Sequence, residues 1–224
     1  MNADIFADPV VVWLGPVPIT RTMLCGAATS VLLLCFAWFV ARAVVRRPSS
    51  RLAALGRIGV RAVHTLVTDA VGQPVGWLEA FAGGLFLFIA GSALIGQLPG
   101  VVAPTANLTT TSALAGCVFL AVPAAGIASR GLGGYAAHYL RPNPLLLPLH
   151  VVSEFSRTVA LALRLFGNML SGHLIVALIV ALVGPLVPVP LMALDLLIGL
   201  LQAYIFAILA CVYIGAALRV GKEE

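Results

Sequence analysis

One charged side chain lies deep inside an apolar stretch in the second half of the sequence. Segment 156–175 reads SRTVALALRLFGNMLSGHLI and contains Arg157 and, about two helical turns further in, Arg164. No Asp, Glu, Lys or Arg occurs in 165–194 or in 196–218. An arginine at the centre of a bilayer costs about 2.5–3.5 kcal/mol on insertion scales, so it requires a water-filled cavity or an opposite charge. Snorkelling to a helix end explains Arg157 well and is the alternative for Arg164, whose depth favours a role in an ion pathway.

Other polar side chains fall at helical spacing around this arginine. The face of the helix that carries Arg164 would also hold Ser153, Arg157, Asn168 and Ser171. His173 would lie on the opposite face. A second polar stripe, on the helix that follows, would hold Asp195, Gln202 and Tyr213. Two polar surfaces with different tasks are therefore expected.

The two helices would pair at matching levels. In an antiparallel hairpin, residues at one level have nearly the same sum of residue numbers, which places Arg164 beside Gln202 and His173 beside Asp195. Gln202 could then hydrogen-bond to Arg164, whereas Asp195 and His173 could share a proton and titrate as a unit. The alternatives are chance alignment of a few polar residues and an ordinary hydrogen-bonded role for His173.

The composition is that of an integral membrane protein. The 224 residues are 61% hydrophobic and 9% charged, with a mean hydropathy of +1.09, whereas soluble domains are about 25% charged. The long apolar runs lack the alternation of a barrel strand. We therefore expect an all-α membrane protein with one integral membrane domain over 1–224. It would comprise an N-terminal span and basic amphipathic segment at 1–75 and an ion-translocating core at 76–224.

About five membrane-embedded helices are expected. Apolar runs of sufficient length occur at about 22–41, 80–98, 110–129, 149–183 and 191–218. An amphipathic helix at 51–71 would lie along the cytoplasmic surface, and the stretch 131–144 would be a connector. Six arginines lie between positions 42 and 61. By the positive-inside rule, that side is cytoplasmic, the N-terminus is outside and the C-terminus is cytoplasmic.

The last two helices are too long to stand upright. Segments 149–183 and 191–218 would measure about 52 Å and 42 Å, against a hydrocarbon core of about 30 Å. Ordinary tilt does not absorb such an excess. The lengths predict a steeply tilted helical hairpin lying partly along the membrane plane.

Three segments carry a family resemblance. LALRLFGNMLSGHLI (161–175) and LLQAYIFAILACVYI (200–214) closely resemble the two characteristic segments of the a subunit of F-type ATP synthases. The loop segment IGQLPGVVAPTANLTTT (95–111) is also similar to that family. The first 75 residues resemble it only in pattern, and the chain is short for a bacterial member. A sodium-coupled class is therefore an alternative to a proton-coupled one.

The resemblance implies a stator subunit that offers two half-channels to a rotating ring of c subunits. Arg164 would face the ring carboxylate and prevent an ion short-circuit, with Gln202 and Asn168 beside it. His173 and Asp195 would be the polar pair of a half-channel. Further lining is expected from Ser153, Glu154, Ser171, Tyr213 and His150, although simple solvation explains Glu154 and His150 equally well.

The resemblance also implies partners and a location. They are the c-subunit ring, the peripheral-stalk b subunits, the catalytic head of the ATP synthase and membrane lipids, in a bacterial cytoplasmic (inner) membrane. No GxxxxGK[ST] motif is present, so this subunit would be non-catalytic, with ATP chemistry in other chains. No cofactor, metal or nucleic acid is expected. The rival interpretations are a secondary ion or solute transporter, which should show internal repeats, and a structural scaffold, which leaves Arg164 unexplained.

Overall fold

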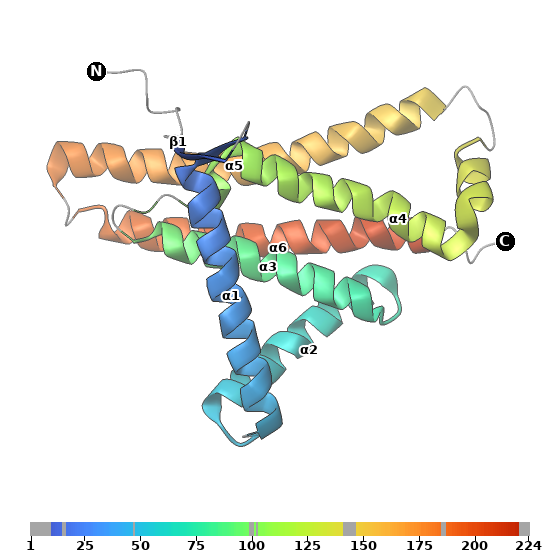
Figure 1. The fold of residues 1–224 in the computed structure, drawn as a ribbon, viewed down its shortest axis with the longest axis horizontal. Helices are drawn as coiled ribbons and strands as arrows, with labels where there is room; N and C mark the ends of the chain where they lie inside the picture. Colours follow the sequence, from blue (N-terminus) through green and yellow to red (C-terminus); the bar gives the residue numbers. More distant parts are fainter. Residues whose placement is uncertain are drawn as a thin grey trace.

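The computed structural model describes residues 10–14, 17–46, 48–98, 101, 103–140, 147–184 and 187–219. The chain is helical over most of this part (Figure 1). Its helices are α1 (Arg21–Arg46), α2 (Arg51–Val71), α3 (Gly76–Gly96), α4 (Leu108–Leu140), α5 (Leu147–Val183) and α6 (Val189–Arg219), with a short 3-10 helix, η1 (Pro104–Ala106). The all-α membrane fold class is confirmed. One small feature was not predicted, an antiparallel hairpin of β1 (Val10–Leu14) and β2 (Val17–Thr20).

Five helices are long and apolar enough to cross a membrane in the described part of the chain. They are Met23–Arg46, Gly76–Gly96, Leu108–Ser129, Val151–Val183 and Val189–Leu218. The five predicted spans are thus confirmed, and the chain is a multi-pass membrane protein. The connector predicted at 131–144 is wrong in part, because α4 continues to Leu140. Gly131 has a non-helical backbone with a φ of 74°, so the chain breaks where the connector was predicted to begin, and a second helical segment follows the kink (Figure 1). Positions 141–144 lie outside the described residues.

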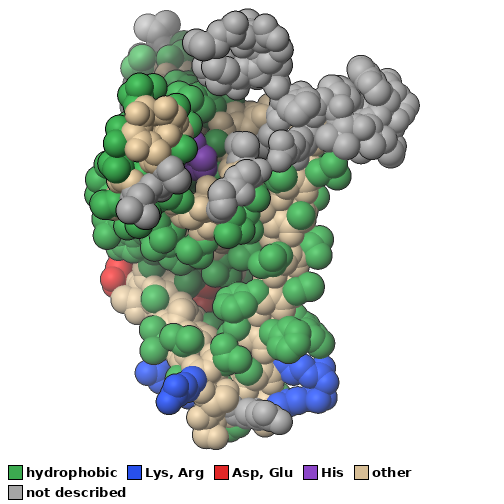
Figure 2. All heavy atoms as spheres, turned by 90° about the vertical axis from the view of Figure 1, so that its left-hand side faces the viewer, with side chains coloured by type: hydrophobic (Ala, Val, Ile, Leu, Met, Phe, Trp, Pro, Cys, Tyr) green, Lys and Arg blue, Asp and Glu red, His purple; other side chains and the backbone are tan. Residues whose placement is uncertain are grey.

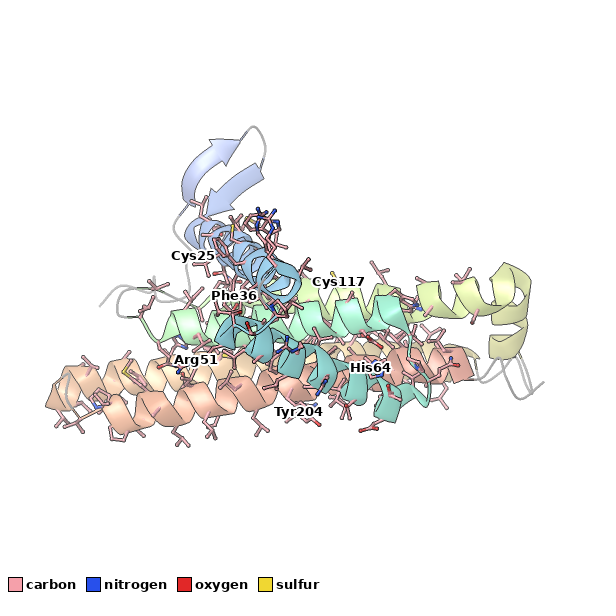
Figure 3. All side chains as sticks on the ribbon, turned by 90° about the horizontal axis from the view of Figure 1, so that it is seen from below. Cys25, Phe36, Arg51, His64, Cys117 and Tyr204 are labelled. Atoms are coloured by element: carbon pink, nitrogen blue, oxygen red, sulfur yellow. The ribbon has the colours of Figure 1, made fainter. Side chains whose placement is uncertain are left out.

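Helix α2 has the bounds that the sequence predicts, and a capping residue at each end explains them. The Ser50 side chain accepts a hydrogen bond from the Ala53 backbone N–H at 3.2 Å, which satisfies a free donor of the first turn. Gly72 closes the other end in the left-handed conformation. Helix α2 then packs across α3 and α6 (Figure 3). His64 joins it to α3 through Nδ1, which lies 2.8 Å from Oε1 of Glu79.

The long helices run in a common direction that α1 crosses steeply (Figure 1). With 37 and 31 residues, α5 and α6 are about 55 Å and 46 Å long. If α1 stands upright in the bilayer, α5 and α6 lie far from the membrane normal. The crossing therefore supports the steep tilt that helix length predicts.

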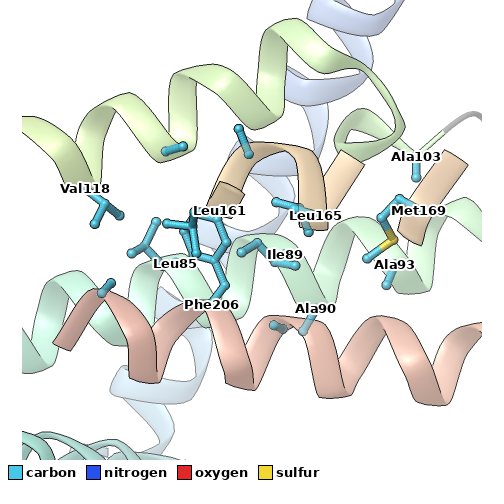
Figure 4. Packing of buried hydrophobic residues seen from close by; sticks show 14 of the residues in the cluster. Leu85, Ile89, Ala90, Ala93, Ala103, Val118, Leu161, Leu165, Met169 and Phe206 are labelled. Carbon is cyan, nitrogen blue, oxygen red and sulfur yellow. The ribbon is translucent and has the colours of Figure 1, made fainter. Parts of the chain in front are cut away.

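The core lies between the hairpin of α5 and α6 and the two helices that pack on it, α3 and α4. Helix α3 packs mainly on α6, and α4 packs mainly on α5. The largest side chains of this core include Ile89, Leu161, Leu165 and Phe206, all fully buried (Figure 4). A second cluster, around Val67, Leu78 and Ile214, joins α2 to α3, α4 and α6. Both arms of the hairpin are thus held at fixed rotations by packing.

Candidate functional site

Arg164 lies on the exposed face of α5. The face about 100° round the helix from Arg164 is buried, through Leu161, Leu165 and Met169. These three residues are four apart, which places them on one side of a helix. Their packing in the core fixes the rotation of α5 and turns Arg164 outwards. The predicted polar stripe shares the outward face: Ser153, Arg157 and Ser171 are exposed and Asn168 is half-buried.

The first arginine of the stripe has partners within the chain. The Arg157 guanidinium lies 4.5 Å from the centre of the Tyr213 ring, and its Nη1 is 4.0 Å from Oε2 of Glu154. By contrast, no hydrogen bond or ion pair engages Arg164 among the residues that the structure describes. The two arginines therefore differ in more than depth. Arg157 is attached to α6, whereas Arg164 is directed away from this chain.

Asp195 lies near the closed end of the hairpin, half-buried on α6. Its Oδ2 accepts a hydrogen bond from Nε2 of Gln97 at 3.1 Å. Gln97 directly follows α3, so this bond joins α3 to α6. Gln97 was not predicted as a site residue. The available signal was an amide in the long uncharged stretch before Pro99, where a polar side chain needs a partner.

Gly172 provides the space that the Asp195 carboxylate occupies. A Cβ atom at position 172 would overlap Oδ1 of Asp195. Asp195 is thus packed against the backbone of α5, one residue before His173. The predicted level of Asp195 on the hairpin agrees with this contact.

His173 lies in the same region with one nitrogen free. Its Nδ1 is 2.8 Å from the Met169 carbonyl oxygen. Because a carbonyl only accepts, Nδ1 must carry the proton, and Nε2 of the neutral ring is then a bare acceptor. Nε2 is buried without a hydrogen-bond partner and would lie 2.9 Å from a Cβ at Gly96. This arrangement can accept a proton at Nε2.

Two predicted side-chain pairs do not form direct hydrogen bonds. Asp195 bonds to Gln97, and no hydrogen bond joins it to His173 in the described part of the chain. Gln202 is 6% exposed, its Nε2 has no partner, and none of the hydrogen bonds between described residues joins it to Arg164. Core packing turns Gln202 inwards while it turns Arg164 outwards.

The remaining predicted positions are dispersed along the hairpin. The Ser171 hydroxyl donates to the Asn168 carbonyl at 3.0 Å, within α5. Glu154 is half-buried near Arg157, and Ser153 is exposed. The side chain of His150 lies outside the described residues. The site thus consists of an inward cluster, formed by Gln97, Gly172, His173 and Asp195, and an outward stripe around Arg164.

Comparison with known proteins gives a consistent result. The family model of the ATP synthase A chain matches residues 23–215. The chain is 45% identical to ATP synthase subunit a 2 of a Picosynechococcus species over 188 residues, which cover 84% of this chain and 81% of that protein. It is 41% identical to ATP synthase subunit a 2 of a Bradyrhizobium species over 217 residues, 97% of each chain. It is 52% identical to ATP synthase subunit a of Albidiferax ferrireducens over 144 residues, 64% of this chain and 62% of that one.

Proposed function

Because this chain belongs to the ATP synthase A chain family, we propose that its exposed Arg164 meets the ion-carrying carboxylate of a rotating c ring. The chain is the ion-translocating stator subunit of the F-type ATP synthase membrane sector. As such it forms a complex with other ATP synthase subunits. The proposal assigns roles to particular residues within that subunit.

The orientation of Arg164 is the observation that carries the proposal. Core packing directs this arginine out of the chain, in the middle of a hairpin whose remaining length is nearly free of charge. Lipid is a costly environment for a guanidinium. A carboxylate on an adjoining surface would remove that cost, and the positive charge would favour its ionised form. The same charge repels a cation that attempts to cross directly between two half-channels.

The inward cluster is the proposed polar segment of one half-channel. His173 offers an unprotonated Nε2, and Asp195 offers a carboxylate held by Gln97. A proton could be received and passed on by these two groups, with Gln97 as a positioning residue. Asn168 and Gln202 are the proposed ion-translocation residues near Arg164. Ser153, Glu154, Ser171, Tyr213 and His150 are the proposed further lining.

The proposal also covers the partners of this chain, its membrane and its orientation there. The c ring, the b subunits of the peripheral stalk and the catalytic head are the proposed partners, and ATP chemistry belongs to the head. The proposed location is a bacterial inner membrane, with the N-terminus outside and the C-terminus in the cytoplasm. The arginine-rich α1–α2 corner supports this orientation under the positive-inside rule.

ATP-driven pumping by the whole complex in vesicles tests these roles. Arg164→Ala should abolish pumping in an assembled complex, because it removes the charge that faces the ring. The matched control is Arg157→Ala, which removes the same charge from the same face of α5 and should retain most of the activity. Pumping that survives Arg164→Ala, or an equal loss in both variants, would contradict the proposal. Running the wild type with and without sodium identifies the coupling ion.

A further inference from the structure

The corner between α1 and α2 carries positive charge that the surrounding sequence does not neutralise. The exposed arginines there are Arg42, Arg46, Arg51, Arg57 and Arg61. No Asp or Glu occurs between residues 9 and 68, and among described residues no ion pair joins these five side chains to a carboxylate. Figure 2 shows basic side chains gathered at this end, below a largely apolar surface. The corner therefore attracts anions.

Two of these arginines line an open pocket between the helices. The pocket has a volume of about 230 Å³ and is lined by Val44, Gly56, Arg57, Val60 and Arg61. A Cβ at position 56 would lie 2.5 Å from Cγ1 of Val40, so α1 and α2 approach closely where the pocket lies. The pocket thus has apolar walls, and the side chains of Arg57 and Arg61 border it.

The Arg57 side chain is already oriented. Its Nη1 donates a hydrogen bond to the Pro48 carbonyl at 2.8 Å, which ties it to the loop after α1. A guanidinium has five N–H donors, so further donors are available to a ligand. Arg42 differs, because its guanidinium lies over the Trp38 ring at 5.0 Å. Arg57 and Arg61 are therefore the pair that a phosphate at the rim of the pocket would meet.

Both helices of the corner expose apolar side chains beside the pocket. Exposed fractions are 67% for Val60, which lines the pocket, and 82% for Val45, which follows the lining residue Val44 on α1. A free phosphate would use the arginines but not this surface. A phospholipid would use both, and basic pockets between membrane helices bind anionic head groups. The lack of acidic side chains disfavours a zwitterionic head group, whose cationic end would find no partner.

We propose that this corner binds an anionic phospholipid, with its phosphate at the rim of the pocket beside Arg57 and Arg61 and its acyl chains along the apolar side chains of α1 and α2. Bidentate contacts from Arg57 and Arg61 would hold the head group. The bound lipid would then fill the space between α1 and α2 at the end of the molecule opposite the β hairpin.

Photo-crosslinking in the assembled ATP synthase tests the site. The whole complex is reconstituted in phosphatidylcholine vesicles that contain a photoactivatable phosphatidylglycerol, and labelled peptides from 40–61 are quantified. Arg57 and Arg61 would add direct charge-assisted hydrogen bonds, each roughly a tenfold gain in affinity, to the diffuse attraction that all arginines of the corner share. The matched control, Arg46→Gln with Arg51→Gln, removes the same charge outside the pocket and loses only diffuse attraction. The double variant Arg57→Gln and Arg61→Gln should therefore lower the apparent affinity roughly 100-fold more than the control does.

Further outcomes separate this site from its alternatives. Equal losses in both double variants would show diffuse attraction to the basic corner and would overturn the proposal. Equal labelling by a photoactivatable phosphatidylcholine would do the same, as would displacement of the lipid by inorganic phosphate. If the pocket variant does not assemble, Arg57→Lys with Arg61→Lys replaces it, because lysine keeps the charge and loses the bidentate contacts. Preferential labelling of 40–61 by phosphatidylglycerol, together with a greater loss in the pocket variant than in its control, supports the proposal.

Discussion

The two polar regions of the α5–α6 hairpin are built in opposite ways. Near the closed end, Asp195 has its space from Gly172 and its hydrogen bond from Gln97. In the middle, Arg164 is exposed without a partner among described residues, and the Nε2 of Gln202 is buried without one. At the closed end the Asp195 carboxyl group is satisfied within this chain, while Nε2 of His173 is left without a partner among described residues. The middle presents a charge for another surface to satisfy, so the same hairpin serves an internal and an external task.

The largest effect at the closed end should come from Gly172→Ala. The added methyl group would overlap the Asp195 carboxylate, so α6 or that side chain must move. Overpacking of this kind costs about 1–3 kcal/mol. We expect less assembled complex and a severe loss of pumping, measured on native gels and in vesicles. The control is Gly116→Ala on α4, where a Cβ meets nothing within 4 Å; an equally harmful Gly116→Ala would refute the steric explanation.

A smaller effect is expected from Gln97→Leu, which tests whether the closed end acts as a unit. The hydrogen bond from Gln97 positions the Asp195 carboxyl group, so loss of the donor should misplace that group and slow pumping roughly tenfold or more. Asp195→Asn should also slow pumping without loosening assembly. Because both changes affect one contact, their combined effect should be well below the product of the two. Independent effects in this double-mutant cycle would mean that Gln97 does not act through Asp195.

The smallest effect is expected from Gln202→Leu, in the middle of the hairpin. The change removes a buried amide whose Nε2 has no partner, so thermal stability of the complex should be unchanged or slightly higher. Pumping should fall, but less than in Arg164→Ala, because only a neutral group is lost. A marked drop in stability would show that Gln202 has a structural role in the core. A greater pumping defect than in Arg164→Ala would reverse the proposed ranking.

Much of the hairpin could be predicted because its signals are local. Long apolar runs and the turn GPLVPVP define arms at 149–183 and 191–218, close to the observed Leu147–Val183 and Val189–Arg219. Helical spacing also places Arg164 in a polar stripe. The β hairpin was missed because its strands have only five and four residues, too few for a clear alternation pattern.

The contacts within the site depend on tertiary packing and were harder to infer. The constant sum of residue numbers in an antiparallel hairpin describes α5 and α6 as two isolated helices. It therefore places Asp195 near His173 but does not include α3. In the structure α3 brings Gln97 to Asp195. The rule also gives no rotation about the helix axis. Packing of α6 on α3 turns Gln202 inwards, which separates it from the outward Arg164 despite their matching levels.

The steep crossing of α1 over the hairpin has an electrical consequence. Arg164 and His173 are separated by about 14 Å along α5. On an upright helix, a charge moved over that distance would cross a large part of the membrane potential, which is worth about 2.3 kcal/mol per charge per 100 mV. On a helix lying nearly flat, the same displacement is sideways and crosses little of the voltage. Most of the electrical work must then be done in the approaches from the two membrane faces.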